Sequence, residues 1–142
     1  MSQVSKRILP KNIAERLFAN FWNLLADIKK PNHIKIFLDD FLSPTEKIML
    51  AKRMAIAILL YKGYDHRSIS SILKVSTTTV SHIASYLLLK TPGYQLLVKK
   101  YSKKEALKEF LQELERYFYS LQPGKHFEED ELVKIKLGHK KQ

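Results

Sequence analysis

The 142-residue chain contains no cysteine, and it has only four glycines and five prolines. The absence of cysteine excludes disulfides, thiolate metal sites and a cysteine nucleophile. The longest apolar run, residues 54–61, has eight residues, whereas a helix that spans a bilayer needs roughly 20. Residues 1–17 lack the apolar core of a signal peptide. We therefore expect a soluble, cytoplasmic protein that does not associate with a membrane.

The motifs of common enzyme classes are also missing. The chain has no P-loop, no dinucleotide fingerprint and no Gly-x-Ser-x-Gly elbow. Its five histidines show no metal-ligand spacing, and the acidic run 128–131 is not framed by a glycine-turned loop. We expect no enzymatic activity, no metal site and no cofactor.

Negative charge is absent from one long tract. Residues 66–104 contain no aspartate or glutamate but seven lysines and arginines. Of the net charge of +11, residues 1–65 contribute +5, the acid-free tract +7 and residues 105–142 −1. This concentration of charge indicates a polyanionic partner for the tract. A basic face that is only solvated is the alternative.

Apolar residues recur at helical spacing through almost all of the chain, and no strand-like alternation is long enough for a sheet. We predict an all-α domain over residues 1–122 and a charged tail over 123–142. The predicted helices cover about 11–28, 32–41, 44–62, 66–73, 76–90, 93–101 and 105–121. Ser43-Pro44-x-Glu46 predicts a capping box, and Ser102 with Glu105 predicts a second one. Residues 54–61 should form a central helix that is buried on most sides.

Residues 66–90 carry the pattern of a helix–turn–helix. Asp65 and Ser76 can cap two helices that are separated by a turn at Lys74 and Val75. The apolar residues that would pack the two helices together are Ile69, Ile72, Leu73, Val75, Val80, Ile83 and Leu87. Because Val80, Ile83 and Leu87 are spaced three and four apart, they share one face of the second helix.

The opposite face of that helix carries short polar side chains that can approach base edges in a DNA major groove. The candidate base-reading residues are Thr77, Thr78, Ser81, His82 and Ser85. Positive residues around the motif, and polar groups at the start of its second helix, can hold phosphates. The candidate phosphate-binding residues are Arg67, Lys74, Ser76, Thr79, Lys90, Lys99, Lys100, Lys103 and Lys104.

Residues 41–90 resemble the Trp repressor superfamily. The shared features are Leu42-Ser43-Pro44-x-Glu46 at a helix start, Arg53 within that helix, Gly63 at its end and the helix–turn–helix after it. The resemblance implies an all-helical, interlocked homodimer that regulates transcription, typically as a repressor. Such a dimer inserts one recognition helix into each of two successive major grooves of a palindromic operator.

The resemblance weakens at the tryptophan site. In the Trp repressor the bound indole lies between two arginines. Ser43 and Arg53 match a ligand-contacting threonine and the first arginine, but His82 stands at the second arginine and Ile83 at an adjacent glycine. A histidine is shorter and mostly neutral at pH 7, and isoleucine would fill the space. We expect no response to tryptophan, and leave open another corepressor or an interface role for Ser43 and Arg53.

Two other functions remain open from the sequence. The chain could be a protein-interaction module whose basic face docks an acidic partner, or it could bind RNA or DNA without sequence preference. The apolar stripes at 13–28 and 107–121 could pack on each other within one chain. Alternatively, they could form the interface of a dimer, which the reading of a two-fold operator requires.

Overall fold

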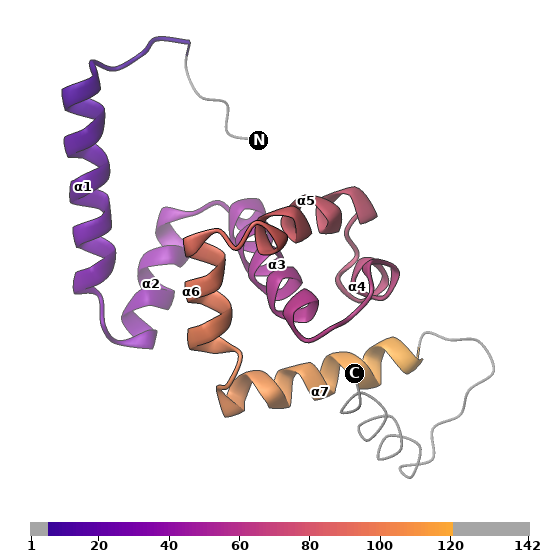
Figure 1. The fold of residues 1–142 in the computed structure, drawn as a ribbon. Helices are drawn as coiled ribbons and strands as arrows, with labels where there is room; N and C mark the ends of the chain where they lie inside the picture. The colour runs from indigo at the N-terminus through magenta and orange to yellow at the C-terminus, as the bar shows by residue number, and fades with distance from the viewer. Residues whose placement is uncertain (1–5, 121–142) are drawn as a thin grey trace. The chain divides into compact units, whose positions relative to one another are not determined.

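The computed structural model describes residues 6–120, in which seven α-helices and no strand occur (Figure 1). This confirms the predicted all-α class. The predicted tail, residues 123–142, lies outside the described residues. The chain divides into two compact units, Met1–Ala51 and Lys52–Gln142. The single domain over residues 1–122 stays a prediction.

The first unit contains α1 (Lys11–Asp27), α2 (Pro31–Phe41) and the start of α3 (Pro44–Tyr61). Phe21 of α1 stacks on Phe41 of α2 with ring centroids 5.8 Å apart. Asp39 of α2 accepts hydrogen bonds from Lys35 at 2.5 Å and from Lys47 of α3 at 3.1 Å. The hydrogen bond from Lys35 is the main reason why the pKa of Asp39 lies below its ordinary value. Neither α1 nor α2 contains a buried residue.

Helix α3 begins with the predicted capping box. The Ser43 backbone N–H donates to the Glu46 carboxylate at 2.7 Å, and the Glu46 N–H donates to Ser43 Oγ at 3.2 Å. Five consecutive residues, Ala55–Leu59, are buried, so the predicted central helix is confirmed over these residues. The prediction is wrong at the two ends of the run, where Met54 and Tyr61 are 41% and 55% exposed. After the helix ends, Gly63 takes φ +92°, a left-handed conformation that glycine adopts without a steric penalty.

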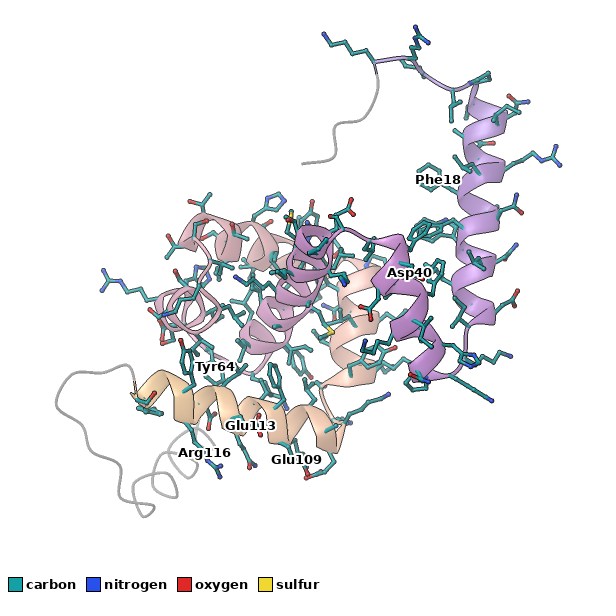
Figure 2. All side chains as sticks on the ribbon, turned by 180° about the vertical axis from the view of Figure 1, so that it is seen from behind. Phe18, Asp40, Tyr64, Glu109, Glu113 and Arg116 are labelled. Carbon is teal, nitrogen blue, oxygen red and sulfur yellow. The ribbon has the colours of Figure 1, made fainter. Side chains whose placement is uncertain are left out.

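The second unit holds the main core. Its remaining helices are α4 (His66–Leu73), α5 (Thr77–Leu88), α6 (Pro92–Tyr101) and α7 (Glu105–Ser120). Buried residues of α3 cluster with Ile69 of α4, Val80 and Ile83 of α5, and Leu111 of α7. Tyr64, just before α4, lies beside α7, where its hydroxyl donates a hydrogen bond to Glu115 (Figure 2). Burial raises the pKa of Tyr64, and the neighbouring Glu115 adds to the effect.

The predicted second capping box is wrong. Ser102 is 2% exposed, and its N–H donates to the carbonyl of Val98 as the C-terminal cap of α6. The Glu105 carboxylate instead pairs with Lys108 at 3.1 Å. Because the Ser102 N–H is already bonded within α6, it is not available as a donor to the Glu105 carboxylate.

Candidate nucleic-acid interface

Helix α4 is fixed at its start by Asp65. One carboxylate oxygen accepts from the Ser68 N–H at 3.0 Å, and the other accepts from the Ser68 hydroxyl at 2.6 Å. The side-chain hydrogen bond from Ser68 is the largest of the effects that lower the pKa of Asp65. The predicted cap is therefore present, and the position of Asp65 orients the first helix of the motif.

The turn between α4 and α5 is set by backbone geometry and two side chains. Lys74 has φ 53° and ψ 54°, a left-handed conformation that stops α4. The Ser70 hydroxyl donates to the carbonyl of Val75 at 2.5 Å, and Lys52 Nζ of α3 donates to the carbonyl of Lys74 at 3.3 Å. The turn is thus tied both to α4 and to the central helix.

Helix α5 presents the face that the sequence predicts. Ser76 Oγ accepts from the Thr79 N–H at 3.1 Å and lies 2.9 Å from Thr79 Oγ1, so both side chains take part in the cap. Val80 and Ile83 are 0% and 3% exposed and belong to the core. The candidate base-reading residues are all exposed: Thr77, Thr78, Ser81, His82 and Ser85. Figure 1 shows α5 joined to α4 by the short turn.

Three of these exposed residues contact other residues of the same chain. Ser81 Oγ shares a hydrogen bond of 3.3 Å with His66 Nδ1 of α4. The His82 ring meets Tyr86 edge-on, with centroids 5.2 Å apart. The Ser85 hydroxyl donates to the His82 carbonyl at 2.6 Å, so in this conformation its proton is engaged within the helix.

The contacts that His66 and Tyr86 make with candidate base-reading residues were not predicted from the sequence. Tyr86 follows His82 by four residues, a spacing that brings side chains together on a helix, so the sequence held a signal for that pair. The contact between His66 and Ser81 joins two helices, and no short spacing could indicate it.

The seven positive residues of the acid-free tract are all exposed, namely Arg67, Lys74, Lys90, Lys99, Lys100, Lys103 and Lys104. None of them forms a salt bridge with any residue in the range 6–120. Lys74 Nζ lies 5.9 Å from the ring centre of Tyr117, and Lys104 Nζ lies 4.9 Å from that of Tyr101. These cations are therefore free of carboxylate partners in the described structure.

The residues that match the tryptophan site lie in three different settings. Ser43 uses its hydroxyl in the capping box of α3. Arg53 is exposed on α3. Ile83 is buried in the core of the second unit, so its side chain occupies interior space that a glycine would leave open.

Within residues 6–120, no group of three or more histidine or acidic side chains is arranged to hold a metal ion. No helix in the same range has the length and apolar character needed to cross a membrane.

The capped helices, the tight turn and the shared apolar interface define α4 and α5 as a helix–turn–helix with an exposed polar second helix. A family model described as Trp repressor protein matches residues 16–102. The chain belongs to the Trp repressor family, a family of helix–turn–helix DNA-binding regulators and not of enzymes. No curated protein and no solved structure matches it significantly.

Proposed function

We propose that this protein is a sequence-specific regulator of transcription, acting as a repressor, that binds double-stranded DNA with α5 in the major groove. The observation that carries the proposal is the division of α5 into two faces. Val80 and Ile83 are buried while the polar side chains between Thr77 and Ser85 are exposed. Short hydroxyl groups and an imidazole can donate to and accept from base edges at close range.

We assign phosphate binding to the cations of the acid-free tract, which have no carboxylate partner within residues 6–120. Lys99 and Lys100 lie in the last turn of α6, and Lys103 and Lys104 follow its C-terminal cap residue. Each phosphate contact of this kind releases counterions from DNA and gives salt-dependent affinity without base preference. Ser76 and Thr79, at the start of α5, would contact a phosphate through their side-chain hydroxyls, because the Thr79 N–H already donates to Ser76 Oγ.

A homodimer on a palindromic operator completes the proposal. Apolar residues on α1 are left exposed in the single chain, among them Leu17 at 57%, Phe18 at 55% and Trp22 at 56%. Several large apolar side chains exposed along one helix favour an interaction site there, and a second copy of the chain would supply the two-fold symmetry that a palindrome needs. We propose a cytoplasmic location, in a cell whose DNA is also in the cytoplasm.

Tryptophan is not the proposed signal. The side chain of Ile83 is part of the core, and His82 contacts Tyr86 through its ring. Neither residue offers the cationic, open site that the family's ligand uses. Arg53 remains available for the partner subunit or for another corepressor.

Selection from a randomised pool of DNA duplexes, by gel shift followed by sequencing, tests this function against the two alternatives. Enrichment of a two-fold symmetric sequence supports the regulator. Binding without enrichment supports a non-specific nucleic-acid binder. A chain that binds no duplex supports an interaction module with an acidic protein partner.

A further inference from the structure

An aromatic column connects the core of the second unit to the exposed face of α5. The ring of Tyr94, on α6, is partly buried and packs against the hydrophobic core. Tyr86 of α5 stacks on Tyr94 with ring centroids 5.5 Å apart and planes inclined by 22°. His82 then meets Tyr86 edge-on at 5.2 Å, with the ring planes at 90°. Both contacts have geometries that aromatic pairs favour.

The middle of this column is also fixed through its backbone. The Tyr86 carbonyl accepts hydrogen bonds from the Thr91 N–H at 3.1 Å and from the Thr91 hydroxyl at 3.2 Å. Thr91 is the N-terminal cap residue of α6. Tyr86 is thus held by α6 at its ring and at its backbone, while 38% of its surface stays exposed.

We propose that Tyr86 and Tyr94 are positioning residues that set the base preference of the recognition helix by holding the His82 imidazole in one orientation. The inference rests on the proposed function, because it assigns a base contact to His82. An exposed histidine without this support would sample several rotamers, and each base contact would then require the ring to be ordered on binding. A ring that is already ordered can select its base without that entropic cost.

The alternative role for Tyr86 is direct contact with DNA through its hydroxyl. In the column, both contacts of Tyr86 are made by its ring, which phenylalanine would keep. Tyr86→Phe should therefore keep the base preference, and Tyr86→Leu should lose it. Tyr94→Leu, which removes the ring that stacks on Tyr86 but keeps Tyr86 itself, should have the same effect as Tyr86→Leu in weaker form.

The experiment measures binding to the selected duplex and to duplexes that differ at each single base pair. The base pair read by His82 is the one at which His82→Ala loses its preference. There we expect Tyr86→Leu to reduce discrimination by about three- to tenfold, the scale of one aromatic contact. In the double variant with His82→Ala, the Tyr86→Leu change should add nothing. Tyr101→Leu is the matched control, since Tyr101 is 40% exposed and lies at the end of α6.

A second measurement does not involve DNA. The imidazole proton and carbon shifts of His82 in the free protein report the neighbouring Tyr86 ring. They should move in Tyr86→Leu and stay in place in Tyr86→Phe and Tyr101→Leu. Unchanged shifts, or a selective wild-type protein whose selectivity survives Tyr86→Leu, would overturn the positioning role alone. A wild-type protein without any base preference would reject the proposed function, and the positioning role with it.

Discussion

At the scale of single residues, the motif depends on side chains that satisfy backbone groups at helix starts. The first N–H groups of a helix have no partner within it. Asp65 supplies an acceptor for α4, Ser76 for α5, and Ser43 with Glu46 supplies two reciprocal bonds for α3. These caps fix where each helix begins and therefore which side chains α5 exposes.

The Asp65 cap predicts a pH-dependent stability. Because the folded pKa of Asp65 is lowered, its contribution is present above the unfolded pKa of about 3.9 and is lost as the pH falls through the folded pKa. Asn can still cap but does not titrate. The free energy of unfolding of the wild type minus that of Asp65→Asn should therefore fall between about pH 5 and pH 2, as measured by urea denaturation. A difference that does not vary with pH would contradict this role.

The phosphate contacts predict a salt effect that does not depend on sequence. Lys99→Ala and Lys100→Ala should weaken binding to all duplexes alike and lower the salt slope by roughly one unit each. Measurement of Kd against salt concentration checks this, and Lys108→Ala is the control, since Lys108 pairs with Glu105.

Ser81→Ala should instead change the base preference, with about 1–3 kcal/mol of binding free energy lost at one base pair and little change at the others. Equal losses on all DNAs from both kinds of variant would reject the division between phosphate and base contacts.

At the scale of elements, α7 braces the helix–turn–helix from outside the region matched by the family model, which ends at residue 102. Its Leu111 joins the core, with Leu107 and Leu114 packed against it. Glu115 accepts from Tyr64 at the entrance to α4. Helix α7 also carries exposed glutamates, including Glu109 and Glu113 (Figure 2), so it differs in charge from the acid-free tract.

Truncation of the buried side chain of Leu111, through which α7 joins the core, should destabilise the second unit. Leu111 is 8% exposed, and Leu111→Ala should cost about 2–5 kcal/mol of unfolding free energy through lost burial and the cavity left behind. Its neighbour Phe110 is 44% exposed, so Phe110→Ala is the control and should cost much less. Denaturant unfolding measures both. Equal costs would show that α7 does not pack in solution as it does here.

Much of the helical framework could be predicted from the sequence because its signals are local. The caps of α3, α4 and α5, and the apolar spacing of Val80 and Ile83, depend on residues only three or four positions apart. The prediction of a capping box at Ser102 failed because the backbone N–H of Ser102 is used by the C-terminal end of α6 and is not available at the start of α7. The contact of His66 with Ser81, and that of Tyr94 with Tyr86, join different helices. They could not be predicted, since such contacts arise only from the packing of those helices.

At the scale of the whole molecule, the two units differ in what they bury. The second unit has a core of fully buried residues, whereas α1 and α2 of the first unit bury none. The apolar stripe of α7 is partly used within its own chain, because Leu111 is buried. Most of the α1 stripe is exposed, and this difference favours α1 as the surface that would meet a second copy.

A charge on α1 should therefore separate the proposed dimer. Trp22 contacts Phe18 and Phe21 with ring centroids 5.9 and 5.2 Å apart, and it is 56% exposed. Trp22→Glu should yield monomers in sedimentation analysis and weaken binding to a palindrome, because one recognition helix would then act alone. Asn23→Glu, at an exposed polar position of the same helix, is the control. A wild-type protein that sediments as a monomer would contradict the dimer.

The central claim, that α5 reads bases from the major groove, is tested most directly by changing one groove of the selected duplex at a time. Replacement of purines by their 7-deaza analogues removes N7 acceptors from the major groove, and replacement of guanine by inosine removes the amino group from the minor groove. The account predicts that 7-deaza purines within the half-sites weaken binding and that inosine leaves it unchanged. Loss of binding with inosine, while 7-deaza purines have no effect, would contradict it.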